Sequence, residues 1–293
     1  MNLRHKFELA DGVALSKMNA QVDRPIGMFD SGFGGLTVAR AVIDLLPSEN
    51  LIYIGDTARY PYGPKPASDV RSFAIELATS LVRDFNAKLI VVACNTAASV
   101  ALSELQSSLS VPVIGVVEPG AWTLVHTTKN NRVAVIGTIG TIASGAYEKA
   151  VADASRKKST DVSLIATACP GFVEFVERDE TSGEAVTQLA EKLLAPIRKA
   201  DVDTLLLGCT HYPYLSQVIG RVMGPDVKLV NSADSTASVV RDVLAKNNIA
   251  RSVGRGVQGS HGFYSSGDVW QFAELGRRFL GPELVSAKHW QIK

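Results

Sequence analysis

The sequence predicts an α/β fold made of two similar doubly wound parallel-sheet domains, with the active site in the cleft between them. Three observations lead to this prediction. Short, wholly apolar runs alternate with longer amphipathic runs, as in parallel strands joined by helical crossovers. The alternation occurs twice along the chain. Its 293 residues also exceed the roughly 150 residues of an average domain.

The first predicted unit begins at Pro25, after a 24-residue extension without a clean period. Its strands are apolar at nearly every position, as at 89–93, because helices cover both faces of a parallel sheet. The intervening segments carry apolar side chains at helical spacing. In order, we expect strand 26–30, helix 36–46, strand 51–54, helix 68–85, strand 89–93, helix 96–109 and strand 111–116.

The second predicted unit repeats this pattern from residue 133 onward. Its elements are strand 133–136, helix 143–155, strand 162–166, helix 183–197, strand 204–207, helix 213–223 and strand 228–230, followed by helices 235–246 and 269–280. The tail returns to the first unit. We therefore expect a flexible extension at 1–24, a first domain at 25–117 plus 230–293, and a second domain at 118–229.

The charge balance excludes several classes of partner. Thirty basic residues oppose 29 acidic ones, for a formal net charge of +1, which argues against a direct nucleic-acid or anionic-membrane footprint. No apolar run approaches the roughly 18 residues of a membrane helix, and residues 1–24 lack the apolar core of a signal peptide. We expect a soluble, cytoplasmic protein.

Two of the three cysteines occupy matching positions in the two units. Cys94 follows strand 89–93 and precedes Asn95 and Thr96, whereas Cys209 follows strand 204–207 and precedes Thr210 and His211. Ligands bind at the carboxyl ends of parallel strands, and a helix N-terminus favours a thiolate. The two thiols are therefore candidates to face each other across a cleft. The alternative is that each is a small buried hydrophobe.

Metal, disulfide and dinucleotide chemistry are disfavoured. The sequence has no Cys-x-x-Cys pair and no ligand-like spacing of Cys and His, so we expect no metal. Residues 30–35 resemble a dinucleotide loop, but Thr37 replaces its third glycine. Asp30 would also oppose a phosphate, and together with Ser31 it suits a ligand ammonium instead. We expect no cofactor.

Other segments leave their alternatives open. Residues 137–141, which include Thr138 and Thr141, form either an anion nest or a structural glycine turn. The loop 56–63 either shapes a pocket or is an ordinary connection. From the residues alone, Cys169 is a packing residue and Glu177 a solvated helix charge.

Several sequence blocks, taken together and in order, closely resemble glutamate racemases of the Asp/Glu racemase family. The resemblance spans about residues 25–280. The blocks are 29–32 with 34–37, 55–59 with 61–63, 93–97, 169–170 with 172–173, and 208–213. The resemblance implies cofactor-independent interconversion of L- and D-glutamate, which supplies D-glutamate for peptidoglycan synthesis, cell-wall biogenesis and cell shape.

The resemblance also assigns roles to individual residues. It implies that Cys94 and Cys209 are the acid/base thiols, acting on D- and L-glutamate respectively, with support from Asp30, His211 and Glu177. The register of Glu177 is open, since Glu174 stands where the family has proline. The expected substrate-binding residues are Asp30, Ser31, Tyr62, Gly63, Asn95, Thr96, Thr138, Thr141, Thr210 and His211.

Racemisation fits this arrangement, because a proton must leave one face of the α-carbon and another must arrive on the opposite face. Two alternatives remain open: a racemase of the same family for aspartate or another amino acid, and a non-catalytic regulator that binds DNA gyrase. The partners expected are glutamate and a second copy of the chain in a homodimer, with gyrase as a further candidate.

Overall fold

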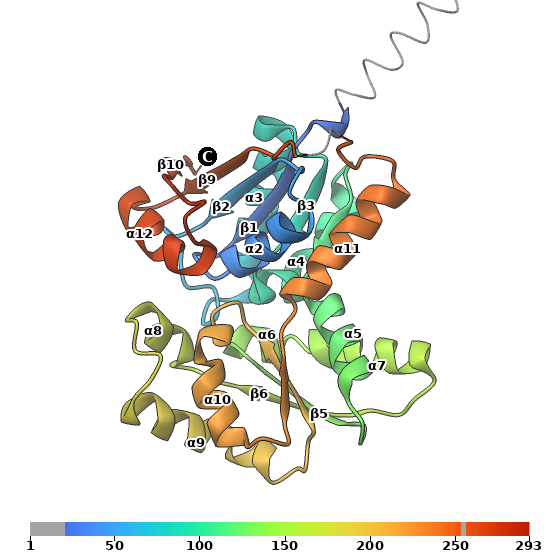
Figure 1. The fold of residues 1–293 in the computed structure, drawn as a ribbon, viewed down its shortest axis with the longest axis vertical. Coiled ribbons are helices and arrows are strands. Elements are labelled where there is room, and N and C mark those ends of the chain that lie inside the picture. Colours follow the sequence, from blue (N-terminus) through green and yellow to red (C-terminus); the bar gives the residue numbers. More distant parts are fainter. Residues whose placement is uncertain (1–20, 253–255, 293) are drawn as a thin grey trace, which may run out of the picture.

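The computed structural model of the protein describes residues 21–252 and 256–292. It has two lobes, each built on its own parallel sheet (Figure 1). The strand order is β10-β9-β2-β1-β3-β4 in the first sheet and β6-β5-β7-β8 in the second. This confirms the predicted fold class. The predicted extension at 1–24 lies outside the described residues except for 21–24.

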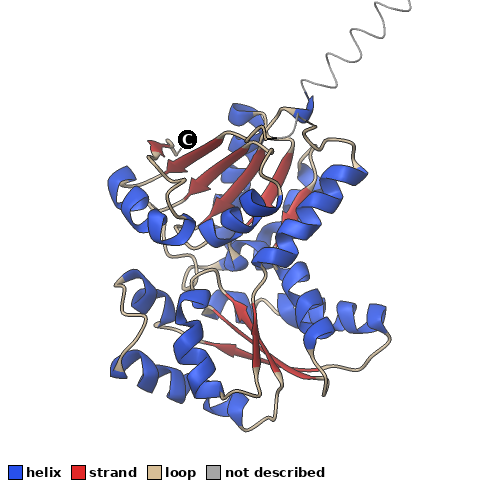
Figure 2. Cartoon of the chain, viewed as in Figure 1, coloured by secondary structure: helices blue, strands red, loops and turns tan. Residues whose placement is uncertain are grey.

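The first sheet comprises six strands of the described chain: β1 (Ile26–Asp30), β2 (Leu51–Gly55), β3 (Leu89–Val92), β4 (Val113–Gly115), β9 (His261–Ser265) and β10 (Lys288–His289). Helices cover both of its faces (Figure 2). On one face lie α2 (Leu36–Leu45), α11 (Ala233–Lys246) and α12 (Val269–Leu280), and on the other lie α3 (Ala67–Phe85) and α4 (Asn95–Ser108).

The second sheet comprises β5 (Arg132–Gly137), β6 (Ser163–Ala168), β7 (Thr204–Gly208) and β8 (Lys228–Val230). One face packs against α5 (Val117–Thr127) and α7 (Ala146–Lys158), and the other against α9 (Glu184–Arg198) and α10 (Ser216–Met223). Three short helical segments lie near the junction of the lobes: α6 (Ile139–Ala143), α8 (Phe172–Glu177) and the 3-10 helix η1 (Tyr212–Leu215).

The core follows from the two-residue period of the strands. In β5, Val133 and Val135 face a core that is continuous with that of the first lobe. Ala134 and Ile136 face a separate core beneath α9 and α10, since successive side chains point to opposite faces of a sheet. The shared core holds the two lobes together behind the carboxyl ends of their strands.

Several elements differ from the prediction. The predicted helix 143–155 corresponds to α7, which begins only at Ala146, because Gly145 before it adopts a left-handed backbone conformation with φ +68°. The predicted helix 213–223 begins as the 3-10 turn η1. The elements α5, α6, α8, β9 and β10 were not predicted. In α5, Pro119 and Gly120 lie near the helix start and weaken its sequence signal.

The chain passes from the first sheet to the second through α5 and returns through α11, and these two helices contact each other. The domain boundaries at 117/118 and 229/230 therefore stay a prediction. Among the helices of the described residues, none has the length and apolar character needed to cross a bilayer.

Candidate active site

A small cavity lies where the carboxyl ends of the two sheets meet, and both Cys94 and Cys209 line it. Its volume is about 20 Å³, which leaves room for about one water molecule. The lining residues are Ser31, Tyr60, Pro61, Tyr62, Gly63, Cys94, Asn95, Thr96, Thr138, Val173, Cys209, Thr210 and His211. The structure thus brings the two thiols, 115 residues apart in sequence (209 − 94), into one nearly closed cavity.

Cys94 follows β3 and caps the N-terminus of α4. Its Sγ accepts a hydrogen bond from the Ala97 amide at 3.5 Å and donates one to the Ser31 hydroxyl at 3.7 Å. Burial, reinforced by the Asp30 carboxylate, raises the pKa of the Cys94 thiol to about 12. The Ala97 amide at the helix N-terminus lowers the pKa of Cys94, as expected, but burial outweighs this effect. Cys94 is held as a neutral thiol.

Cys209 follows β7 and is paired with a histidine. Its Sγ lies 4.0 Å from Nδ1 of His211, whose Nε2 lies 3.6 Å from Oε1 of Glu177 at the end of α8. Burial lowers the pKa of His211, but the contacts with Cys209 and Glu177 outweigh burial and raise it to about 10. His211 therefore carries a positive charge at neutral pH, directly beside the Cys209 sulfur.

Asp30 lies behind the cavity, outside its lining. Its Oδ2 accepts a hydrogen bond from the Gly32 amide at 2.9 Å, while Oδ1 is buried without a hydrogen-bond partner. Burial raises the pKa of this carboxyl, against the opposing effect of the His211 charge. Asp30 therefore supplies a buried hydrogen-bond acceptor that interacts electrostatically with both Cys94 and His211.

A second buried carboxylate, Asp56, anchors the loop that delivers Tyr62 and Gly63 to the cavity. It accepts hydrogen bonds from the Tyr62 hydroxyl and from Ser266 Oγ at 2.7 Å, and it forms an ion pair with Arg59 at 2.7 Å. Contacts within the loop 56–63 therefore hold its shape, and the Ser266 contact fixes it to the residue that follows β9. Of its two sequence interpretations, the pocket-forming one is confirmed by the cavity lining.

Three threonine hydroxyls form a closed ring between the lobes. Thr96 Oγ1 lies 2.9 Å from Thr138 Oγ1 and 3.2 Å from Thr141 Oγ1, and the last two lie 2.9 Å apart. The Gly140 amide also donates to the Gly63 carbonyl at 3.0 Å. Thr96 and Thr138 line the cavity, whereas Thr141 supports them from behind. These contacts draw the two lobes together at the cavity wall.

Four residues near the cavity were given no role by the sequence. Tyr60, Pro61 and Val173 line it, and the Tyr60 ring lies 6.1 Å from that of His211, measured between centroids. Tyr60 and Pro61 belong to a loop that the sequence did single out. The fourth residue, Tyr147, donates a hydrogen bond to Asn95 Oδ1 at 2.6 Å. No local pattern predicts this last contact, because it joins the two lobes.

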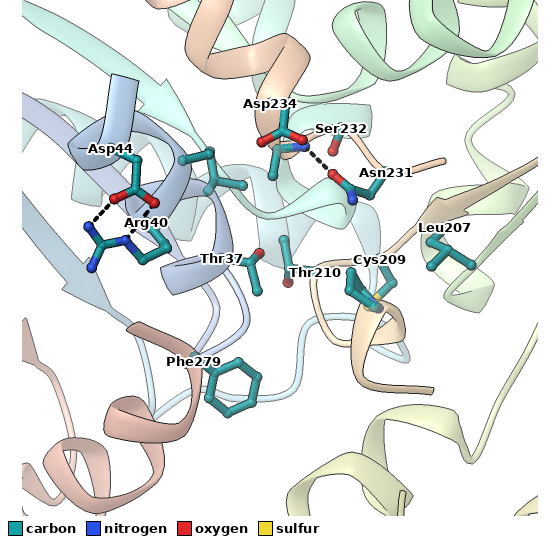
Figure 3. Close-up of a pocket in the computed structure, with 14 residues that line it drawn as sticks. Thr37, Arg40, Asp44, Leu207, Cys209, Thr210, Asn231, Ser232, Asp234 and Phe279 are labelled. Atoms are coloured by element: carbon teal, nitrogen blue, oxygen red, sulfur yellow. Dashed lines mark hydrogen bonds and ion pairs between the residues drawn. The ribbon is translucent and has the colours of Figure 1, made fainter. Parts of the chain in front are cut away.

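A larger hollow of about 240 Å³ opens on the other side of Cys209 and Thr210, between α2, α12 and the start of α11 (Figure 3). Its polar side chains are partly paired with one another: Arg40 with Asp44, and Asn231 with the Ala233 amide. It contains only one of the two thiols. Over residues 21–252 and 256–292, no three Cys, His, Asp or Glu side chains form a group suited to a metal.

The fold and the cavity define an α/β enzyme with a thiol from each lobe facing one interlobe site. A family model described as Asp/Glu/Hydantoin racemase matches residues 36–240. The chain belongs to this family, and it is an isomerase of the amino-acid racemase type.

Several individual proteins that are similar to this chain are glutamate racemases. A glutamate racemase from Parafrankia sp. (strain EAN1pec) is 49% identical over 262 residues, which cover 89% of this chain and 92% of that protein. The crystal structure of a glutamate racemase isoform from Bacillus anthracis matches with a TM-score of 0.82 and 39% identity, covering 92% of this chain and 97% of the other. A glutamate racemase from Francisella tularensis, solved in complex with D-glutamate, matches with a TM-score of 0.81 and 32% identity, covering 93% and 98%.

Proposed function

We propose that this protein is a glutamate racemase that interconverts L- and D-glutamate by proton transfer between two thiols, Cys94 and Cys209. The observation that carries the proposal is that these two side chains, one from each sheet, line a single buried cavity. Relatives that share up to 49% of their residues with this chain carry the same name. The assignment of Cys94 and Cys209 as the proton carriers is supported by this geometry and by the sequence resemblance to glutamate racemases.

The two thiols have different surroundings, and this difference supplies the base and the acid. The imidazolium of His211 lies beside Cys209, which is the arrangement in which a cysteine serves as the base. Cys94, with its pKa raised to about 12, holds a proton and is the acid. On L-glutamate, Cys209 takes the α-proton and Cys94 delivers its own proton to the opposite face.

This step conserves protons and charge. The product is D-glutamate, with Cys94 as the thiolate and Cys209 as the thiol, so the same site is then set for the reverse reaction. Protons exchange with solvent before another L-glutamate reacts. The scheme requires no cofactor, because both proton carriers belong to the chain.

Polar groups around the cavity can hold the substrate and its carbanion. The hydroxyls of Ser31, Thr96 and Thr210 and the amide of Asn95 are donors for the carboxylate, where negative charge grows as the α-proton leaves. The unpartnered Nδ2 of Asn95, which lines the cavity, is a donor for the carboxylate. The unpartnered Oδ1 of Asp30 is an acceptor that the substrate ammonium would reach only once the cavity has widened. We assign the side-chain carboxylate to the end of the cavity lined by Thr138 and Gly63, with Thr141 supporting Thr138 from behind.

The cavity must widen before glutamate can bind, since a space for about one water is too small for this substrate. The Thr96, Thr138 and Thr141 hydroxyls bridge the lobes, so their ring must open or rearrange. After closure, exclusion of water strengthens the electrostatic interactions inside.

We place the enzyme in the cytoplasm, where its product would serve peptidoglycan synthesis. A homodimer and an interaction with gyrase stay predictions. The choice of glutamate over aspartate rests on the relatives' names together with the Thr138 hydroxyl, which lines the cavity.

The test incubates the purified protein separately with L-glutamate and with L-aspartate and records the circular dichroism signal of each amino acid over time. We expect the glutamate signal to decay to zero and the aspartate signal to persist. The matched control is Cys169→Ser, which alters the third buried cysteine and should retain most of the activity. Racemisation of aspartate alone would overturn the substrate assignment.

A further inference from the structure

We propose that Tyr147 is a positioning residue that fixes the side-chain amide of Asn95 so that its NH2 group faces the substrate carboxylate. The inference rests on the proposed function, because it assumes that the cavity binds glutamate. Tyr147 itself is not among the residues that line the cavity.

The contact joins the two lobes. Asn95 is the first residue of α4 in the first lobe, and Tyr147 lies in the first turn of α7 in the second. The Tyr147 hydroxyl donates to Asn95 Oδ1 at 2.6 Å, and both residues are buried. The other end of the amide, Nδ2, is buried without any hydrogen-bond partner, and Asn95 lines the cavity.

The hydrogen bond decides which end of the amide remains available. Because Oδ1 already accepts from the phenol, the Asn95 side chain is left with its NH2 group as the free end. An NH2 group suits a carboxylate, whereas a rotated amide would present an oxygen to a negatively charged group. A buried donor with no partner is also costly, so a ligand acceptor is its natural complement.

The tyrosine ring is in turn held by the strand that delivers the second thiol. A Cβ atom placed on Gly208 would lie 3.0 Å from Cε2 of Tyr147, so the ring packs closely against the residue that precedes Cys209. Burial raises the pKa of the Tyr147 phenol, which keeps its proton available. The position of one lobe's thiol and the orientation of the other lobe's amide are therefore coupled through this ring.

The first test is Tyr147→Phe, which keeps the ring and removes only the hydroxyl. We expect KM for both glutamate enantiomers to rise about tenfold, with kcat changed less, as for loss of one oriented hydrogen bond. The matched control is Ser80→Ala, which removes a buried partner of Trp290 Nε1 (3.0 Å) in the first lobe, away from the cavity. Both variants lose one buried hydrogen bond, so both should lower the midpoint of thermal unfolding to a similar extent. Only Tyr147→Phe should change KM.

The second test asks whether Tyr147 acts through Asn95. In an Asn95→Ala background, Tyr147→Phe should weaken substrate binding no further, measured as KM and as the thermal stabilisation produced by D-glutamate. The stabilisation measurement does not depend on turnover, so it applies even to a slow variant. The proposal is overturned by an unchanged KM in Tyr147→Phe, or by an equal loss of binding with and without Asn95. Absence of racemisation in the wild type would instead overturn the proposed function.

Discussion

The imidazole of His211 bridges Cys209 and Glu177, with Nδ1 4.0 Å from the sulfur and Nε2 3.6 Å from the carboxylate. Cys94 lies beside a carboxylate instead. Its sulfur interacts with the Asp30 carboxylate, which acts with burial to raise its pKa. The two thiols of one cavity thus have opposite electrostatic surroundings, which is the difference that an acid and a base acting on opposite faces require.

The charge of His211 predicts an alkaline limit to activity. Because the pKa of His211 is raised to about 10, the imidazolium persists to that pH and is lost above it. We expect kcat/KM of the wild type to fall above about pH 10. In His211→Asn, kcat/KM should be low at every pH and should lack this alkaline fall. Full pH profiles in both directions provide the measurement. An unchanged alkaline limb in His211→Asn would assign it to another group.

The contact between Glu177 and His211 predicts a shift of that limb. Glu177→Gln removes the negative charge that favours the imidazolium, so the alkaline limb should move to lower pH and the rate should fall. The control is Glu174→Gln, three residues earlier on α8, whose side chain is exposed. It should leave the profile unchanged. If the two variants behave alike, Glu177 does not act through His211.

His211 also predicts a change of stability with pH. Its pKa is above the ordinary value of 6.5 in the folded state, so the native protein binds the proton more tightly than the unfolded chain. The resulting stabilisation is complete below about pH 6.5 and is lost as the pH rises toward about 10. The free energy of unfolding in urea should decline across this window, and it should decline less in His211→Asn. Equal slopes would contradict the raised pKa.

A buried ion pair far from the thiols predicts a loss of stability. Lys88 Nζ lies 2.6 Å from Glu49 Oε2, and both side chains are at most 4% exposed. Lys88→Ala leaves the Glu49 carboxylate buried without its cation and should cost about 3–5 kcal/mol. Arg241→Ala breaks the exposed pair with Asp242 and should cost less than about 1 kcal/mol. Urea unfolding measures both, and equal costs would contradict the importance of burial.

The sequence predicted the alternation of strands and helices because parallel strands are apolar throughout and their helices are amphipathic. It failed where other interactions outweigh local signals. Pro119 and Gly120 weaken the helical signal of α5, and Gly145 delays the start of the helix expected at 143–155. The strand β9 is added beside β2 by pairing across more than 200 residues, a distance at which no local pattern operates.

The candidate site was predictable to the extent that its residues follow strands. Cys94 and Cys209 stand at strand ends, and the threonines at 138 and 141 follow β5. From the residues alone, Glu177 was a solvated helix charge, whereas the structure places its carboxylate against His211. The contact between Tyr147 and Asn95, and the raised pKa of Cys94, depend on burial between the two lobes. Neither has a signature in the sequence.

The central claim is that Cys94 and Cys209 carry protons to opposite faces of glutamate. The most direct test incubates glutamate in heavy water with the wild type, Cys94→Ser and Cys209→Ser, and follows α-deuterium by mass spectrometry and the enantiomers by chiral chromatography. We predict deuterium in both enantiomers with the wild type, and loss of racemisation by at least about a hundredfold in each variant. Racemisation at the wild-type rate by either serine variant would contradict two-thiol catalysis.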